Sequence, residues 1–315
     1  MPKQLTKQLT KQLWLKDDRQ RMNNSHYEFF HNFTDRPAAS EFHAHDFYEI
    51  FFLLSGSVDY LVENRTYPLR PGDIILTNTS ELHRAVFRGD KPCERYVAWI
   101  HPGFMERCCA FFHTDIAVCF DSSSQMHYNL LKADSDTLAE IRGLFERLLE
   151  GRDTGADAGA GADTDVSADT DAGTGTFARA WNDCHTAELL LLLNQVHANT
   201  TVTPGIHVIT SEKVSDILYY INQHLAEPLT LEDIAGHFYL SKYYLTRLFK
   251  QYTGLPLHQY IRKKRLITAK NLMLAGSGIS SACMNSGFNN YSHFSYCFKQ
   301  EFALSPTDYL RVWGK

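Results

Sequence analysis

The chain has 315 residues, of which 44% are hydrophobic and 21% are charged. This composition excludes an intrinsically disordered protein and supplies enough apolar material for two domain cores. The net charge of -5, taken alone, disfavours a polyanionic partner such as nucleic acid. No purely apolar run, such as the leucines at 189–193, exceeds five residues, far short of the roughly 20 residues of a membrane span. We therefore expect a soluble protein that has no membrane partner.

The N-terminal arm, residues 1–24, contains the repeat KQLT, and its leucines at positions 5, 9 and 13 fit one stripe of a frayed helix. It lacks the apolar stretch and cleavage site of a secretory signal. The seven cysteines form an odd set with no CxxC pair, which is typical of free thiols in a reducing compartment. The sequence therefore predicts a cytoplasmic location.

The middle of the chain differs in composition from the rest. Of the 26 residues 151–176, all but Val166 and Ser167 are Gly, Ala, Asp, Thr or Arg, with six aspartates against one arginine. Such a tract cannot bury enough apolar surface to offset its chain entropy, so we expect an acidic low-complexity linker. Residues 211–315 instead hold 12 Lys and Arg against 7 Asp and Glu, a net charge of +5. The positive net charge expected of a nucleic-acid binder is therefore confined to the C-terminal third.

Residues 25–133 are predicted to form a β-rich domain. Between 41 and 87, short runs of Phe, Tyr, Ile, Val and Leu are broken by turn residues such as Ser55-Gly56. Alternate side chains of a strand project to the same face. If residues 43–53 form one strand, the residues that share a face are His43, His45, Phe47, Glu49, Phe51 and Leu53. His83 follows the next pair of strands and can close the group.

The order His43-x-His45-x3-Glu49, followed by Pro71-Gly72-Asp73 and His83, resembles the paired motifs of the cupin superfamily. The resemblance implies a small β-barrel in which His43, His45, Glu49 and His83 would hold Fe, Mn, Ni or Zn if a metal were bound. Asn78 and Ser80 replace the usual proline and glycine, which weakens an enzymatic interpretation. We favour no metal and no cofactor, and expect an effector pocket with neighbouring aromatic rings that suit a sugar. Its expected residues are His43, His45, Phe47, Glu49, Phe51 and His83.

Two amphipathic helices are predicted beyond the barrel, one at 134–150 and one at 177–199 on either side of the linker. Their apolar stripes fit two arrangements equally well. They can pack on the barrel of their own chain, or they can form the seam of a homodimer, because a stripe does not indicate which copy it faces.

Residues 211–315 contain two predicted helix-turn-helix units. In the first, Thr230 caps a short helix, and Ser241 caps a second helix at 242–252 that ends at Gly254. In the second, a helix at 279–286 turns at Gly287-Phe288 into a helix at 290–302. The two recognition helices are joined by a helix at 257–274, about 27 Å long. This length is comparable to the roughly 34 Å between successive major-groove faces, so one monomer can read two grooves.

The segments LSKYYLTRLFK at 240–250, GFNNYSHF at 287–294 and SPTDY at 305–309 resemble the AraC/XylS family of bacterial transcription regulators. The resemblance implies contacts to base edges, with Arg247 as the best candidate for guanine, and phosphate contacts from lysines. Tyr296 stands where the family often has arginine, so the second unit is expected to read bases less strictly. The expected DNA-binding residues are Lys242, Tyr243, Thr246, Arg247, Lys250, Tyr291, Ser292, His293, Ser295, Tyr296 and Lys299.

The sequence thus predicts an α+β two-domain protein, with a cupin-like β-barrel and flanking helices followed by an all-α domain. We expect a regulator that binds double-stranded DNA as a homodimer and responds to a small-molecule effector, with metabolic genes as targets. RNA polymerase is left open as a partner, and no catalytic residues are expected. Two alternatives remain: a metal-dependent cupin enzyme with an accessory helical domain, and a regulator whose barrel only dimerises.

Overall fold

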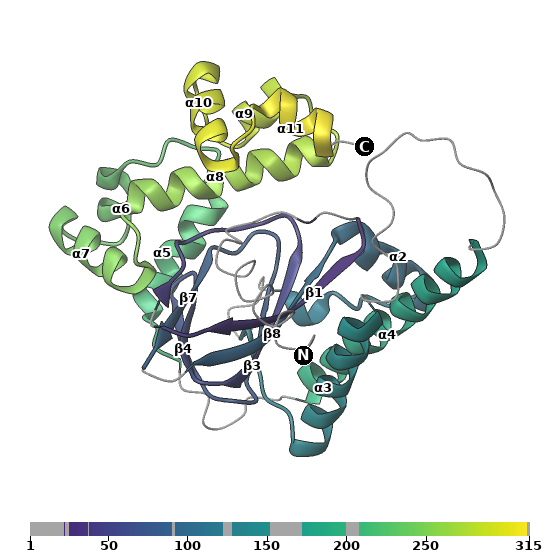
Figure 1. The fold of residues 1–315 in the computed structure, drawn as a ribbon. Helices are drawn as coiled ribbons and strands as arrows, with labels where there is room; N and C mark the ends of the chain where they lie inside the picture. Colours follow the sequence, from purple (N-terminus) through teal and green to yellow (C-terminus); the bar gives the residue numbers. More distant parts are fainter. Residues whose placement is uncertain are drawn as a thin grey trace. The chain divides into compact units, whose positions relative to one another are not determined.

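The structure is a computed structural model that describes residues 22, 25–36, 38–89, 92–121, 128–151, 172–199 and 208–313. Most of the predicted arm 1–24 and linker 151–176 lies outside the described residues. Residues 172–176, predicted as linker, are helical, so the helix predicted at 177–199 begins at Ala172. The chain divides into two compact units (Figure 1). No helix in the described part of the chain is long and apolar enough to cross a membrane.

The N-terminal half contains two sheets. Strands β1, β8, β3, β6 and β9 form one sheet in that order, and β2, β7, β4 and β5 form the other. The pairs β1 with β8, β3 with β8 and β6, and β2 with β7 are antiparallel. The strands are β1 (Tyr27–Thr34), β2 (Ala38–Ala39), β3 (Tyr48–Ser55), β4 (Ser57–Val62), β5 (Arg65–Leu69), β6 (Ile74–Thr77), β7 (His83–Arg88), β8 (Cys93–Ile100) and β9 (Leu130–Leu131). The predicted β-rich domain is confirmed.

Strand β3 begins later than the sequence pattern predicts. It starts at Tyr48, so His43 and His45 lie in the irregular segment before it and not on the same strand as Glu49. From Tyr48 onwards the alternation holds: Ile50 and Phe52 belong to the core cluster that includes the helices. Glu49 and Phe51 therefore project from the opposite face of the five-stranded sheet, which we call the inner face.

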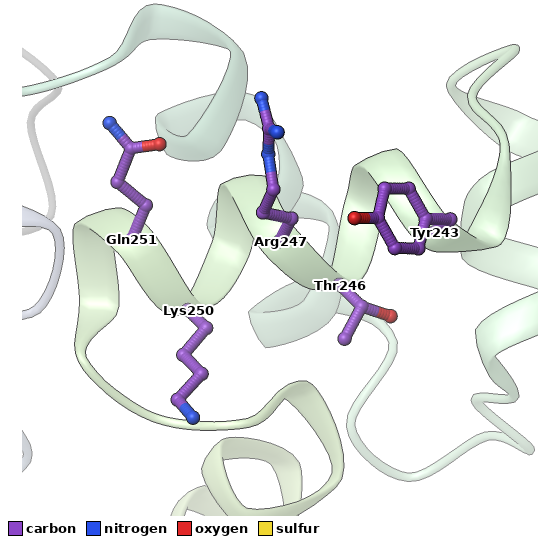
Figure 2. Close-up of a pocket in the computed structure, with 5 residues that line it drawn as sticks. All are labelled: Tyr243, Thr246, Arg247, Lys250 and Gln251. Atoms are coloured by element: carbon purple, nitrogen blue, oxygen red, sulfur yellow. The ribbon is translucent and has the colours of Figure 1, made fainter.

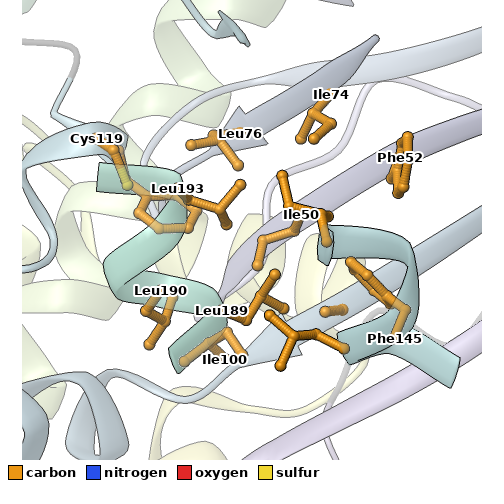
Figure 3. Packing of buried hydrophobic residues seen from close by; sticks show 14 of the residues in the cluster. Ile50, Phe52, Ile74, Leu76, Ile100, Cys119, Phe145, Leu189, Leu190 and Leu193 are labelled. Carbon is orange, nitrogen blue, oxygen red and sulfur yellow. The ribbon is translucent and has the colours of Figure 1, made fainter. Parts of the chain in front are cut away.

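A layer of helices covers the other face of this sheet. It consists of α2 (Pro102–Phe112), the short 3-10 helix η2 (Val118–Phe120), α3 (Ser135–Glu150) and α4 (Ala172–Asn199). Figure 1 shows α3 and α4 side by side. Leu189, Leu190 and Leu193 of α4 are fully buried in one cluster with Ile50 and Phe145 (Figure 3). The leucine stripe of α4 therefore packs on the sheet of its own chain, which supports the first of the two predicted arrangements.

The C-terminal third is helical. Its helices are α5 (Glu212–Gln223), α6 (Leu231–His237), α7 (Lys242–Thr253), α8 (Leu257–Leu274), α9 (Ile279–Asn285), α10 (Tyr291–Phe302) and α11 (Pro306–Trp313). The predicted caps are confirmed. Thr230 and Asp233 form a capping box at α6, and the Ser241 hydroxyl accepts the backbone N–H of Tyr244 at α7. Gly254 ends α7 with a φ of 71°, a conformation that favours glycine.

Helix α8 links the two helix-turn-helix units, α6–α7 and α9–α10. The ring of Phe249 on α7 packs edge to face on Tyr260 of α8, with centroids 5.4 Å apart. Phe294 and Phe298 of α10 share a core cluster with Met273 of α8 and with Tyr309 of α11. Leu245 and Phe249 on α7, and Phe294 and Phe298 on α10, therefore form the buried sides of the two recognition helices.

Candidate DNA-reading surface and effector pocket

Helix α7 presents the first candidate DNA-reading surface. Leu245 and Phe249 are fully buried beneath it, whereas Tyr243 is 76% exposed. The outward side chains of α7 line a surface hollow of about 380 Å³ (Figure 2). The lining residues are Tyr243, Thr246, Arg247, Lys250 and Gln251. Four of these five residues are ones that the sequence predicts to contact DNA.

The side chains of α7 differ in how far they are already engaged. Lys242 forms an ion pair with Glu232 of α6, and the Thr246 hydroxyl donates to the Lys242 carbonyl at 2.8 Å. Arg247 and Gln251 extend to one side of the helix and Lys250 to the other (Figure 2). Gln251 was missed by the sequence reasoning, although its spacing of four from Arg247 places it on the same face.

Helix α10 presents the second candidate surface. Tyr291 and Tyr296 are 47% and 66% exposed, and Ser292, His293 and Lys299 are exposed as well. Ser295 is only partly exposed. The Nε2 atom of His293 lies 3.4 Å from the Sγ atom of Cys297, one turn further along α10. This surface has fewer charged side chains than that of α7, since Lys299 is the one cation among its predicted contact residues.

A polar junction joins the segment after α5, helix α8 and the second helix-turn-helix unit. The guanidinium of Arg265, on α8, donates to the carbonyl of Leu225 at 2.9 Å and to that of Glu227 at 2.7 Å, just beyond α5. Gly287, in the turn before α10, has a φ of 90° and sits against the same guanidinium. Burial lowers the pKa of Arg265 below its usual range, yet the group stays cationic at neutral pH. The junction therefore connects α5, α8 and the second unit.

The inner face of the five-stranded sheet carries the predicted Glu49 and Phe51. Both carboxylate oxygens of Glu49 accept hydrogen bonds: Oε1 from the Tyr60 hydroxyl at 2.7 Å and Oε2 from the Trp99 indole at 2.9 Å. The Phe51 ring packs edge to face on Tyr60, with centroids 4.9 Å apart. Phe47 is fully buried, and its ring stacks on the His45 ring with centroids 3.8 Å apart. Glu49 and Phe51 thus share the partner Tyr60, and Glu49 and Phe47 share the partner Trp99.

Three of the four predicted metal ligands come together. One ligand nitrogen from each of His43, His45 and His83 lies within 4.8 Å of the other two. The Nδ1 atom of each ring lies 2.8–3.0 Å from the backbone carbonyl two residues away along the chain. A carbonyl can only accept, so Nδ1 carries the proton and a neutral ring offers Nε2 as a ligand atom. Glu49 is outside this group, and its Oε2 lies 3.6 Å from Nε2 of His45.

Arg95 is a polar residue of the inner face that the sequence reasoning missed. It shares this face with Trp99, four residues further along β8. Its guanidinium donates to the Thr34 hydroxyl at 2.9 Å and lies 4.5 Å from the centre of the Phe87 ring. Burial lowers the pKa of Arg95 below its usual range. The parity of Arg95 with Trp99 in the run 93–100 is the signal that could have found it.

Comparison with known proteins gives two family matches, one in each half of the chain. Residues 33–168 match an AraC-like ligand binding domain, and residues 234–311 match a helix-turn-helix domain. The chain belongs to the AraC family of transcription regulators. As an AraC-family protein it is a ligand-responsive, DNA-binding transcription regulator, and its two-domain α+β fold is the one that the sequence predicts.

Among curated relatives, the regulatory protein PocR of Salmonella typhimurium is 37% identical over 117 residues, which span 36% of this chain and 38% of PocR. The HTH-type transcriptional activator RhaS of Salmonella arizonae is 24% identical over 272 residues, covering 86% of this chain and 87% of RhaS. Among solved structures, ToxT of Vibrio cholerae is 16% identical, covers 92% of this chain and all of its own, and has a TM-score of 0.37. The C-terminal domain of AraT from Geobacillus stearothermophilus is 30% identical over 33% of this chain and 88% of its own, with a TM-score of 0.33.

Proposed function

We propose that this AraC-family regulator reads two adjacent major-groove boxes with α7 and α10 and senses a metabolite on the inner face of its β domain. The exposed face of α7 carries the DNA part of the proposal, because it combines a guanidinium, an amide and an ammonium group around one hollow. Arg247 is assigned to a guanine edge, and Lys250 to phosphate. Tyr291, Ser292, His293, Ser295, Tyr296 and Lys299 are assigned to the second box.

The assignment of the boxes is tested by selecting binding sites from random DNA with the full-length chain and two variants. Arg247→Ala is expected to relax the preference at one base pair of the first box and to weaken binding by about 1–3 kcal/mol. Lys250→Ala is expected to weaken binding to all sequences alike and to lower the salt slope by about 1. If both variants select the wild-type sequence with unchanged affinity, α7 does not read the first box.

The effector part of the proposal rests on the inner face, where His45, Glu49 and Arg95 lie among aromatic rings. A sugar or a related metabolite can use the same combination of ring faces and polar groups. Screening sugars and small acids for a shift in melting temperature tests it. A shift that is lost in Glu49→Gln but kept in Arg88→Gln, whose side chain is 61% exposed, is the expected result.

A divalent metal ion is the second candidate occupant of the β domain. The three converging histidines favour it, with His43, His45 and His83 as ligands and a Lewis acid or a structural ion as its role. Metal analysis of the purified chain distinguishes the two occupants. Stoichiometric metal that is lost in His45→Ala supports a metal centre. If the metal-loaded protein also turns over a small substrate, the enzyme alternative is favoured over our proposal of a regulator without catalysis.

We further propose that the protein acts in the cytoplasm as a homodimer. On α4, Phe177 and Trp181 stay 71% and 52% exposed although the leucine stripe is covered, and they suit a contact with a second copy. Sedimentation equilibrium is expected to give a dimer for the wild type and a weaker dimer for Trp181→Ala. A monomeric wild type in that experiment would count against the dimer. A transcription assay with purified RNA polymerase would decide whether the protein activates transcription.

A further inference from the structure

Arg95 places a positive charge on the inner face of the five-stranded sheet. Its guanidinium lies over the Phe87 ring at 4.5 Å and near the Phe51 ring at 5.8 Å, and it donates to the Thr34 hydroxyl. All of these groups are neutral. No acidic side chain in the described part of the chain forms an ion pair with Arg95. The Glu49 carboxylate acts on the Arg95 charge from a distance and favours its cationic form, but it takes none of the guanidinium N–H donors.

A guanidinium in these surroundings is costly unless an anion joins it. It carries five N–H donors and cannot be deprotonated in proteins, and one donor is used by Thr34. The nearby rings cover a face of the group, while its edges are where an oxyanion binds through two parallel hydrogen bonds. Arg88 offers a contrast, since its exposed side chain pairs with Asp59.

We propose that the effector is a small organic anion whose carboxylate or phosphate pairs with Arg95. This inference rests on the proposed function, in which the inner face binds the effector, and it names the chemical class of the ligand. Arg95 supplies the charge and the Phe87 and Phe51 rings contact the carbon body. Thr34 orients the guanidinium.

The other end of the inner face is also polar. Strands β3 and β8 pair so that Leu53 lies opposite Arg95 and Glu49 lies opposite Trp99. The position opposite Arg95 is therefore four residues from Glu49 along β3. At about 3.3 Å per residue, this separation is about 13 Å along the strand. Glu49 and Tyr60 there present a carboxylate and a hydroxyl. An anion with several hydroxyl groups, such as a sugar acid or a sugar phosphate, matches the polarity of both ends.

The first experiment compares acids with their neutral counterparts on the full-length chain. The probes are galacturonate, gluconate and glucose 6-phosphate, each against galactose or glucose at equal ionic strength, with melting temperature and calorimetric Kd as readouts. We expect acids alone to bind and Arg95→Gln to weaken them by at least about ten-fold. Comparing the Kd values of galacturonate and gluconate with that of glucose 6-phosphate shows whether the site prefers a carboxylate or a phosphate. Neutral sugars that bind as tightly as their acids would overturn the proposal and leave the proposed effector function standing.

The second experiment needs no natural ligand. Melting temperatures of wild type, Arg95→Met and Arg88→Gln are measured in sodium sulfate and in sodium chloride of equal ionic strength. The melting temperatures of the wild type and Arg88→Gln are expected to rise more in sulfate than that of Arg95→Met, because sulfate occupies the Arg95 site. Equal gains in all three proteins would contradict an oxyanion site at Arg95. If Arg95→Met fails to fold, Arg95 serves folding and the proposal is likewise overturned. If instead no compound binds while the sulfate difference is present, the anion site stands and the metabolite assignment fails.

Discussion

A side chain on residue 287 would collide with the backbone of residue 225: a Cβ atom built on Gly287 comes within 2.2 Å of the Leu225 carbonyl oxygen. Leu225 follows α5, and Gly287 lies in the turn of the second helix-turn-helix unit. Arg265 donates to the same carbonyl. The close approach therefore holds the second unit against the end of α5.

Gly287→Ala is expected to destabilise the protein by at least about 2 kcal/mol, because alanine is strained at a φ of 90° and the carbonyl of Leu225 must move. Urea unfolding of the full-length chain measures the change. Gly236→Ala is the matched control: a Cβ atom placed there meets no neighbouring side chain within 4 Å, and alanine in a helix gains about 0.5–1 kcal/mol over glycine. Equal stability of the two variants would argue against the close approach.

Local signals in the sequence predict the elements that surround this junction but not the junction itself. Gly287 is recognisable as a turn residue, and Ser241 and Thr230 as helix caps, because each of these features depends on neighbours within a few residues. The partnership of Arg265 with Leu225 joins residues 40 positions apart, and it depends on how three helices pack. Such contacts leave no periodic signal.

The inner face shows the same limit. Parity predicts that Glu49 and Phe51 share a face, but it does not show that β3 begins only at Tyr48. Parity also places Arg95 on the same face as Trp99, but only the pairing of β8 with β3 shows that this face is the one that carries Glu49. The leucine stripe of α4 was recognisable, whereas the surface that it covers became known only from the packing.

Replacing the Arg265 guanidinium is expected to weaken binding to two-box DNA more than binding to one-box DNA. Arg265→Gln weakens the hold on the carbonyls of Leu225 and Glu227, so the angle between α7 and α10 becomes less defined. We expect about ten-fold weaker binding to a two-box site, or about 1.4 kcal/mol, with one-box binding unchanged. Fluorescence anisotropy measures both. Arg311→Gln, whose side chain is 78% exposed, serves as control, and equal losses on both DNAs would count against a positioning role.

The leucines of α4 differ in what they contribute to stability. Leu193 is fully buried against the sheet, and Leu193→Ala is expected to lower the free energy of unfolding by about 2–5 kcal/mol. Leu191, two positions away, is 38% exposed, and Leu191→Ala should change the free energy of unfolding by less than about 1 kcal/mol. Thermal and urea unfolding check the pair. The reverse order would show that the other face of α4 is the packed one.

Thiol reactivity should follow burial. Burial raises the pKa of Cys108 to about 11 and that of Cys119 further, so at pH 8 both are protonated and shielded. Cys184 is exposed. Alkylation at pH 8 followed by mass spectrometry is expected to modify Cys184 first and Cys119 only after denaturation. Raising the pH towards 11 should speed the modification of Cys108. Rapid labelling of Cys119 in the folded protein would be incompatible with its position in the core.

The most direct test of a DNA-reading α7 is the affinity of the full-length chain for a selected site and for a scrambled one, measured over a range of salt concentrations. The account predicts tighter binding to the selected site, a Kd that rises steeply with salt, and loss of most of the preference in Arg247→Ala. Equal affinity for selected and scrambled DNA, or an Arg247→Ala variant that binds like the wild type, would contradict it.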